Sequence, residues 1–333
     1  MTDAALDVIG VGNAIVDVLA KSDDAFLAAH SIPKGGMILI DEAQASTIYN
    51  AMAAGVEVSG GSAANSIACI ASLGGKGGFV GKVFADTLGD IFRHDLRAMG
   101  VEFNTAPLDG EGPATGRCLV NVTPDAQRSM TTFLGAAGLV SPDDIDENQI
   151  TRAAITFFEG YLFEQPVARE AFIRACAIAK RNGKRTALTL SDASCVDRQF
   201  DVLQQFIPQH IDILLANDRE AETLFGTDDL NVIAEKARKL CPLTAVTLSE
   251  KGSVLIPRDG EVVNIAPVAP TQLVDTTGAG DAYAAGLLFG LARGYELESA
   301  GALGSLAASE VISYFGARPE QSLKALAEKA GLL

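Results

Sequence analysis

The sequence predicts an α/β fold with a mainly parallel central sheet flanked by helices, and three observations support this. Short runs rich in β-branched and aromatic residues alternate with longer segments of helical periodicity along nearly the whole chain. The 333 residues are 48% hydrophobic and 20% charged, which is enough apolar material for a sizeable core. The 33 glycines are typical of a fold with many tight turns. Strands that alternate with helices of this length form βαβ units, and therefore a mostly parallel sheet.

The elements of this sheet follow one another in regular order. The expected strands are Val8–Val11, Phe79–Val83, Ala154–Glu159, Thr186–Leu190, Ile211–Ala216 and Ala245–Leu248. The expected helices are Ala63–Leu73, Leu88–Met99, Val167–Asn182, Val232–Leu240, Asp281–Arg293 and Leu297–Tyr314. The glycine-rich segment Gly74–Gly78 is expected to be a turn between a helix and the strand that follows it.

Two regions interrupt the alternation. The first runs from Val16–Leu19 to Met37–Ile40, and the second contains Arg117–Val122 and Ser129–Phe133, which the turn-rich segment Thr123–Gln127 joins as a β-hairpin. The segments at about 16–40 and 114–134 could form a small discontinuous sheet inserted into one domain of residues 1–333. Such a sheet is a candidate lid that keeps water away from a reactive group. Ordinary edge strands are the alternative, and the pattern alone favours neither.

Bulk charge and cysteine content narrow the functional class. A net charge of −16 argues against nucleic acid, which requires a basic surface, and against an anionic membrane. The five cysteines include no C-x-x-C pair, which argues against a zinc site or a disulfide framework. The N-terminal segment has no signal-peptide features, and no run approaches the ~18 apolar residues of a membrane span. We therefore expect a cytoplasmic protein.

The strongest chemical signal is Asp275–Asp281, DTTGAGD, followed by the apolar helical run AYAAGLLFGLA. A Gly-x-Gly turn that opens a helix leaves backbone N–H groups unpaired, and the helix dipole adds positive potential. Gly278, Ala279 and Gly280 can therefore form an anion hole for the charge on a transferred phosphoryl group. Asp281 at its edge can accept the proton of an attacking hydroxyl as general base. For an isolated G-x-G-D, an aspartate that only caps the helix would be the better explanation.

Four motifs together resemble those of the ribokinase-like (PfkB) carbohydrate kinases. They are GNAIVD at 12–17, GGSAAN at 60–65 with SLGG at 72–75 and VGKV at 80–83, NDRE at 217–220, and DTTGAGD at 275–281. Their order and spacing agree with the family from about residue 7 to residue 319. The resemblance implies a ribokinase-like fold with a small β-sheet lid, and an ATP-dependent kinase that phosphorylates a hydroxyl group, with Asp281 as the base.

The resemblance also implies which residues hold the acceptor substrate. Asn13 and Asp17 lie in the first motif, and Asp17 follows an apolar strand and could accept hydrogen bonds from two adjacent sugar hydroxyls. A turn aspartate is the alternative. Gly61 allows close backbone approach, and Asn65 offers both a donor and an acceptor to a hydroxyl. The start of an ordinary helix would explain the last two residues equally well.

Two further positions concern the nucleotide and its metal. Asn217 and Glu220 follow the strand-like run IDILLAN, and ligands of α/β sheets bind at the carboxyl ends of strands. The resemblance implies that Asn217 lies at the nucleotide and that Glu220 holds Mg²⁺. We expect Glu220 to do so through water, because Mg²⁺ keeps much of its hydration. Helix capping by the same pair is an alternative that the sequence leaves open.

The nucleotide and a monovalent cation complete the implied site. TLSEKG at 247–252 resembles the family's nucleotide-binding turn T-x-G-x-x-G, with Thr247, Ser249 and Gly252 in its positions and serine in place of the first glycine. Gly316–Ala317 resembles a loop that, with Asp275, forms a monovalent-cation site in many relatives, so that K⁺ joins ATP and Mg²⁺ among the expected cofactors.

Several segments resemble the adenosine-kinase branch of the family. They are VSGGSAAN at 58–65, TGRC at 115–118, EGY at 159–161 and LTLS at 188–191. The branch implies that Cys118 and Tyr161 lie near a nucleoside base, which the tyrosine ring could stack on. A core aromatic at a strand end is the alternative for Tyr161. We expect the 5′-hydroxyl of adenosine to be the acceptor, while a simple sugar such as ribose or fructose competes closely. Whether the protein is a monomer or a homodimer stays open.

Three other functions are weaker. A nicotinamide-dependent oxidoreductase is suggested by G-x-G at Gly10–Gly12, but Ile15 stands where that fingerprint needs Gly or Ala. A non-catalytic protein that binds a sugar or nucleoside would not need Asp281 and its anion hole intact. The chain has no G-x-x-x-x-G-K-[ST] sequence, which excludes a Walker A kinase.

Overall fold

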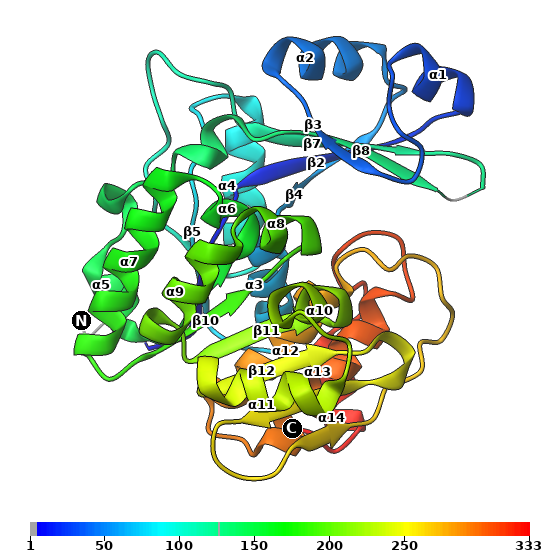
Figure 1. Ribbon diagram of the computed structural model, residues 1–333. Helices are drawn as coiled ribbons and strands as arrows, with labels where there is room; N and C mark the ends of the chain where they lie inside the picture. The colour runs from blue at the N-terminus through cyan, green and yellow to red at the C-terminus, as the bar shows by residue number, and fades with distance from the viewer. Residues whose placement is uncertain (1–4, 126) are drawn as a thin grey trace.

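A computed structural model describes residues 5–125 and 127–333, which form two β-sheets of unequal size (Figure 1). The described strands of the large sheet, in spatial order, are β14 (Val263–Ile265), β13 (Ser253–Pro257), β12 (Leu243–Thr247), β11 (Ile213–Asn217), β10 (Arg185–Thr189), β9 (Ala153–Glu159), β1 (Leu6–Val11), β5 (Gly77–Val80) and β6 (Glu102–Phe103). Neighbours from β12 to β6 pair in parallel, and β13 and β14 add an antiparallel edge. The expected, mainly parallel sheet is confirmed.

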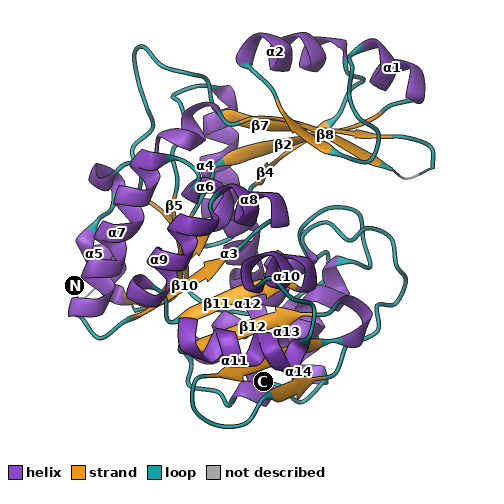
Figure 2. Cartoon of the chain, in the orientation of Figure 1, coloured by secondary structure: helices purple, strands orange, loops and turns teal. Residues whose placement is uncertain are grey.

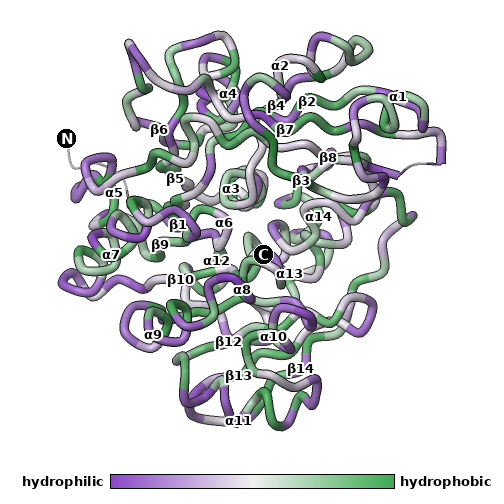
Figure 3. Tube along the Cα trace, turned by 45° about the horizontal axis from the view of Figure 1, so that its top comes forward, coloured by the Kyte–Doolittle hydropathy of each residue, from purple (hydrophilic) through white to green (hydrophobic). Residues whose placement is uncertain are grey.

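Helices cover both faces of the large sheet (Figure 2). One face packs against α3 (Ser62–Ser72), α4 (Thr87–Ala98), α12 (Ala279–Ala292), α13 (Leu297–Val311) and α14 (Leu323–Lys329). The other packs against α5 (Glu147–Arg152), α6 (Gly160–Phe163), α7 (Pro166–Arg181), α8 (Ala193–Arg198), α9 (Phe200–His210), α10 (Asp218–Phe225) and α11 (Leu230–Leu240). Successive strand residues face opposite covers, as Leu214 and Leu215 do in β11. In Figure 3 the strands contain hydrophobic stretches, while outer helices such as α9 and α11 carry hydrophilic ones.

The interrupted regions form the second sheet, as expected. Its order among the described residues is β3 (Met37–Leu39), β8 (Arg128–Phe133), β7 (Gly116–Val122), β2 (Ile15–Lys21) and β4 (Val56–Gly60). The expected hairpin pairs β7 with β8 antiparallel, and part of its turn, residue 126, lies outside the described residues. Helices α1 (Asp24–Ala29) and α2 (Glu42–Ala51) lie over the outer face (Figure 1). The segments are therefore not edge strands of the large sheet.

β2 illustrates how the small sheet divides its residues. Val16 and Val18 are buried in the core beneath α1 and α2, while Ile15 and Asp17 line a cavity on the opposite face. This alternation follows from the period of two in a strand. The inner face of the small sheet is therefore free to carry polar, functional side chains.

Some observed element boundaries differ from those expected from the sequence. β5 begins at Gly77 and ends at Val80, so the expected strand Phe79–Val83 is shifted, and two of the glycines expected in a turn at 74–78 belong to the strand. A Cβ atom at Gly77 would lie 2.7 Å from Cγ2 of Ile67, which means that glycine is present to let α3 approach the sheet. β4 and the antiparallel edge strands β13 and β14 are not predicted by the sequence pattern. α13 ends at Val311 rather than Tyr314.

The topology brings the large sheet's strand ends to the small sheet. β1 ends at Val11, and the chain enters β2 after only Gly12, Asn13 and Ala14. Because β9, β11 and β12 run parallel to β1, their carboxyl ends meet at the same edge. In residues 5–125 and 127–333, no helix is long and apolar enough to cross a membrane.

Candidate active site

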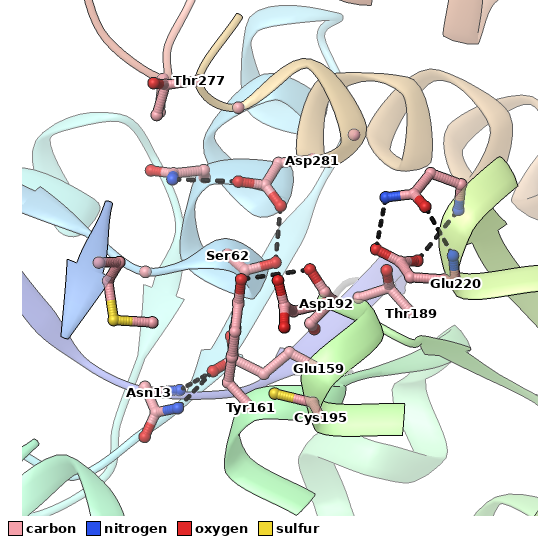
Figure 4. Close-up of a pocket in the computed structure, with 18 of the residues that line it drawn as sticks. Asn13, Ser62, Glu159, Tyr161, Thr189, Asp192, Cys195, Glu220, Thr277 and Asp281 are labelled. Carbon is pink, nitrogen blue, oxygen red and sulfur yellow. Dashed lines mark hydrogen bonds between the residues drawn. The ribbon is translucent and has the colours of Figure 1, made fainter. Parts of the chain in front are cut away.

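A cavity of about 820 Å³ lies between the strand ends of the large sheet, the start of α12 and the inner face of the small sheet (Figure 4). Most residues expected in the site line it: Asn13, Asp17, Gly61, Asn65, Cys118, Tyr161, Asn217, Glu220, Thr247, Gly278, Ala279, Gly280 and Asp281. Ser249, Gly252 and Asp275 lie outside its wall. A second cavity of about 1140 Å³ adjoins the first and shares Asp17, Asn65 and Cys118 with it.

Asp281 lies in the first turn of α12, where its carboxylate is held on both sides. Ser62 Oγ donates to Oδ1 over 2.6 Å, and Asn65 Nδ2 donates to Oδ2 over 3.2 Å. Burial raises the pKa of Asp281, while these two hydrogen bonds oppose the rise. A buried carboxylate with a raised pKa is a stronger proton acceptor than one in water, as a general base requires. Ser62 is a site residue that the sequence motif contains but that we did not assign from it.

The turn before Asp281 has the geometry expected of an anion hole. Gly278 precedes the helix with a φ of 76°, and a Cβ atom there would lie 2.7 Å from Cα of Ala317. Both the left-handed conformation and the close approach require glycine. Ala279 N already donates to the carbonyl oxygen of Thr276 over 3.3 Å. The other first N–H groups of the helix have no partner within it and are available to an anion.

Asp17 lies on the inner face of β2, against the backbone of β4. Burial raises the pKa of its carboxyl to about 6, and the charges of Arg318 and Arg128 oppose that rise. A Cβ atom at Gly60 would lie 2.3 Å from Oδ2 of Asp17, so the neighbouring strand leaves space for the carboxylate only because it has glycine there. Asp17 therefore faces the cavity as a buried acceptor, the arrangement that binding to sugar hydroxyls needs.

Glu159, the last residue of β9, organises the opposite side of the cavity. Its Oε1 accepts from Asn13 N over 2.8 Å and from Asn13 Nδ2 over 2.6 Å, and its Oε2 accepts from Ala63 N over 2.8 Å (Figure 4). Burial raises its pKa to about 7, and these donors oppose the rise. The contacts orient the amide of Asn13 so that Oδ1 is buried with no hydrogen-bond partner within the described residues. That oxygen is available to a ligand donor.

The sequence contained a signal for Glu159 that we assigned to its neighbour. In the segment Glu159–Tyr161, the resemblance indicated only the aromatic residue. Glu159, the acid at the end of an apolar strand, is the residue that accepts three hydrogen bonds. Tyr161, in α6, lines the cavity with its ring and donates its hydroxyl to the carbonyl oxygen of Ser191 over 3.2 Å. The position of Tyr161 is compatible with a ring that stacks on a base and also with the alternative, a structural aromatic at a strand end.

Cys118 and several apolar residues form the wall beside Tyr161. Burial raises the pKa of the Cys118 thiol to about 12, so the side chain is neutral, and Thr132 Oγ1 donates to its sulfur over 3.4 Å. The apolar residues of this wall are Ile15, Met37, Leu39, Met130 and Leu134. This end of the cavity is suited to a flat apolar group, while the end at Asp17 and Asp281 is polar.

Asn217 and Glu220 form the helix cap that the sequence left open. Asn217 Oδ1 accepts from Glu220 N over 2.8 Å, while Glu220 accepts from Asn217 N over 3.0 Å and from Asn217 Nδ2 over 2.7 Å. Glu220 is nevertheless at the cavity, and burial raises its pKa to about 7. The described residues contain no group of three acidic, His or Cys side chains that could hold a metal. Mg²⁺ at kinase sites commonly uses one or two carboxylates, water and phosphate, and a single carboxylate fits that pattern.

The segment Thr247–Gly252 keeps the backbone of a glycine turn despite its serine. Ser249 has a φ of 53° and Gly252 a φ of 89°. The positive φ at Ser249 explains why a glycine would be favoured there, and the substitution leaves a strained residue rather than a different turn. Thr247 lines the cavity from the end of β12, so contact with a nucleotide stays a prediction for all three positions.

Asp275 lies three residues before Gly278, and both of its carboxylate oxygens have partners. Its Oδ2 forms an ion pair with Arg128 Nη2 at 2.5 Å and accepts from Gly316 N over 2.9 Å, while Oδ1 accepts from Thr277 N over 3.0 Å. Arg128 also lies over the ring of Phe315, 4.1 Å from its centroid. Gly316 is near Asp275 as expected, but a guanidinium already balances the carboxylate. A monovalent cation would have to compete with Arg128 in this conformation.

Arg318 is the functional candidate that the sequence motifs did not indicate. It follows the Gly316–Ala317 loop, donates Nε to Asn65 Oδ1 over 3.2 Å and donates Nη1 to Ser59 Oγ over 2.9 Å. Its only sequence signal is its place directly after a loop that resembles a family motif. The charge of Arg318 lowers the pKa of both Asp17 and Asp281, although the burial of each carboxyl outweighs it.

Comparison with known proteins gives consistent matches over nearly the whole chain. A model described as pfkB family carbohydrate kinase matches residues 31–323. Adenosine kinase from Sinorhizobium meliloti is 46% identical with a TM-score of 0.91, covering 98% of this chain and 100% of that one. A probable sugar kinase from Rhizobium etli is 42% identical with a TM-score of 0.92, covering 99% and 100%. Adenosine kinase from Saccharomyces cerevisiae is 29% identical over 92% of this chain and 94% of its own.

Proposed function

Because the chain belongs to the pfkB family of carbohydrate kinases, we propose that it phosphorylates the 5′-hydroxyl of a ribonucleoside, with adenosine the preferred substrate. As a member of this family it is an ATP-dependent kinase that acts on a sugar or nucleoside. The observation that carries the finer proposal is the 46% identity with the Sinorhizobium meliloti adenosine kinase over 98% of the chain.

The two-ended cavity supports a nucleoside as the acceptor. Asp17, Asn65 and Asp281 at the polar end offer acceptors and a donor to ribose hydroxyls, and Gly61 lets the ribose approach the backbone. The apolar end, with Cys118 and Tyr161, offers a surface on which a purine can stack. A free sugar would leave that apolar surface uncovered. The cavity therefore favours a ligand with a sugar and a base.

In the proposed reaction Asp281 accepts the proton of the attacking hydroxyl. Ser62 and Asn65 hold the carboxylate in place before the reaction, so little reorganisation is needed when the hydroxyl attacks. The N–H groups at Gly278–Gly280 face the charge that develops on the transferred group. Asn13 and Asp17 hold the sugar, and the small sheet closes over the cavity as a lid that excludes water.

ATP and Mg²⁺ are assigned to the side of the cavity at the ends of β11 and β12. Asn217 and Thr247 would face the nucleotide, and Glu220 would hold Mg²⁺ through water. When bound, Mg²⁺ neutralises charge on the phosphate oxygens. The turn with Ser249 and Gly252 follows Thr247 directly and is closed by a hydrogen bond from Leu248 N to Gly252 O over 2.7 Å.

A kinase of a simple sugar is the second candidate. Its specific support is the 42% identity with a protein described as a probable sugar kinase from Rhizobium etli. The polar end of the cavity alone would hold ribose or fructose, because the residues that bind the hydroxyls do not depend on the base.

One comparison of substrates distinguishes the two candidates. We would measure kcat/KM for adenosine, ribose and fructose by coupled release of ADP, with Mg²⁺ and ATP in excess. Adenosine is expected to have the highest value, since it alone fills both ends of the cavity. A higher kcat/KM for either free sugar would replace the nucleoside proposal by the second candidate and leave the kinase assignment intact.

A further inference from the structure

The amide of Asn65 lies between the proposed base and a half-buried arginine. Its Nδ2 donates to Asp281 Oδ2, and its Oδ1 accepts from Arg318 Nε, each over 3.2 Å. An amide group has nearly the same shape when it is turned by 180°, so its neighbours decide which way it points. A carboxylate only accepts and a guanidinium only donates. Together they hold Asn65 in the one orientation in which it donates to Asp281.

Arg318 is itself held in place by a loop that is tied at both ends. Gly316 N donates to Asp275 over 2.9 Å, and Gln321 N donates to Glu310 over 2.9 Å. At the guanidinium, Nη1 donates to Ser59, whereas Nη2 is buried and has no hydrogen-bond partner within the described residues. The side chain lines the larger cavity beside Asp17 and Asn65. Arg318 is therefore a half-buried arginine that two hydrogen bonds, to Asn65 and Ser59, hold against the site.

The surroundings of Asp281 contain many acids and one cation. Within the described part of the chain, the titratable groups whose charges interact with Asp281 are Asp17 on β2, Cys69 on α3, Glu159 on β9, Tyr161 on α6, Glu220 on α10 and Arg318. Arg318 is the cation of this group. Arg318 also lowers the pKa of Asp17, together with Arg128 on β8, and its own charge interacts with Asp95 on α4.

We propose that Arg318 is a positioning residue for phosphoryl transfer, which orients the Asn65 amide toward Asp281 and supplies a positive charge close to Asp281 and Asp17. This inference rests on the proposed function, because it takes Asp281 as the base. Without the charge of Arg318, the protonated carboxyl is favoured, so a higher pH is needed before the base can act. A side chain at position 318 that keeps the charge but lacks Nε would leave Asp281 ionised, while Asn65 would lose its fixed orientation.

The test separates these two roles with two variants. In Arg318→Gln, the acidic limb of the pH profile of kcat/KM should move to higher pH by on the order of one pH unit. In Arg318→Lys the charge remains, so the limb should stay near the wild-type position while kcat falls about tenfold, because the amide is no longer held. Arg185→Gln is the matched control, since Arg185 is a partly buried arginine that donates to Leu291 O and lines neither cavity. It should keep the wild-type limb.

A second measurement does not depend on any substrate. In protein labelled with ¹³Cγ-aspartate, and with Asp281→Asn and Asp17→Asn used for assignment, the pKa of both carboxyls should rise in Arg318→Gln. Unchanged carboxyl pKa values in a folded Arg318→Gln protein, or superimposable acidic limbs, would overturn the proposal. If the wild type phosphorylates neither nucleosides nor sugars, the proposed function fails, and the NMR titration still decides whether Arg318 sets these ionisations.

Discussion

The two walls of the cavity are built in different ways. The wall with Asp281 is local: the proposed anion hole Gly278–Gly280 and the proposed base lie in one turn at the start of one helix. The wall with Asp17 belongs to a sheet whose strands come from residues 15–133, and the ion pair of Arg128 with Asp275 joins that sheet to the large body. In the proposed function, the reaction therefore depends on a short segment, while substrate recognition depends on long-range strand pairing. Changes to the first wall should lower turnover, and changes to the second should alter substrate choice.

The largest effect is expected at the local wall. Asp281→Asn removes the proton acceptor but keeps the shape of the side chain, so kcat should fall by roughly 10²–10⁴ with little change in substrate affinity. The measurement is steady-state kinetics with adenosine together with binding by calorimetry. Asp201→Asn, which changes an exposed acid in the first turn of α9, should leave kcat unchanged. Turnover near the wild-type value in Asp281→Asn would remove Asp281 from the reaction.

At the other wall, Asp17→Ala should change discrimination more than chemistry. A site with buried polar groups rejects a substrate that lacks the matching hydroxyl, because those groups are left unpaired. The wild type should therefore prefer adenosine to 2′-deoxyadenosine, and the variant should lose about 10-fold to 100-fold of that preference while KM for adenosine rises. The ratio of the two kcat/KM values measures this. An unchanged ratio would mean that Asp17 does not read the ribose diol.

A smaller effect is expected for the metal. Glu220→Gln should raise the Mg²⁺ concentration that gives half-maximal activity by about tenfold, because a carboxylate in the outer coordination of the metal is lost. Glu222→Gln, an exposed change on the same helix, is the control and should leave the titration unchanged. If both variants match the wild type, Glu220 acts only in the helix cap that it forms with Asn217.

Asp17 should also stabilise or destabilise the fold according to pH. Its pKa is raised from 3.8 to about 6 in the folded protein, so the folded state binds the proton more tightly than the unfolded state. The contribution to stability is present in full below about pH 4 and is lost as the pH rises through 6. Asp17→Asn should therefore raise the free energy of unfolding at pH 7.5 by roughly 1–3 kcal/mol, and by much less at pH 4. Denaturant unfolding at both pH values measures this, and a benefit that is equal at both would contradict it.

The smallest effect is a change of dynamics without mutation. If the small sheet is a lid, adding adenosine should slow amide hydrogen exchange in β2, β3, β7 and β8, with β11 in the large sheet as an internal control. Protection limited to the Asp275–Asp281 turn would mean that the two sheets keep a fixed arrangement.

The sequence predicted the local wall better than the other one, for a physical reason. The DTTGAGD segment contains its own turn together with the proposed anion hole and base, and the structure has the expected glycine turn, with a φ of 76° at Gly278. The parallel sheet was equally accessible, because each of its strands carries its own hydrophobic pattern. Local patterns of this kind need no partner to be recognised.

The residues that sequence reasoning missed are those that distant contacts define. Glu159 acquires its role only when Asn13 and Ala63, from two other segments, meet its carboxylate. Arg318 is one polar residue in a loop until folding brings it to Asn65. β4 was missed because VEVSG is short and partly exposed, and only pairing with β2 makes it a strand.

The small sheet consists of two continuous stretches of chain, residues 15–60 and 116–133. The first is flanked by Gly12 and Gly61 and the second begins at Gly116 and is followed by Gly135, so that both stretches join the large body at glycines. Such joints make the stretches natural units of recombination: a chimaera that receives both from a relative would take that relative's residues at positions 17 and 118 while keeping its own Asn13, Asn65 and Tyr161 and its own Asp281. Diversification of a kinase family by exchange of modules, rather than by gradual change of the reacting groups, is the evolutionary route that this architecture opens.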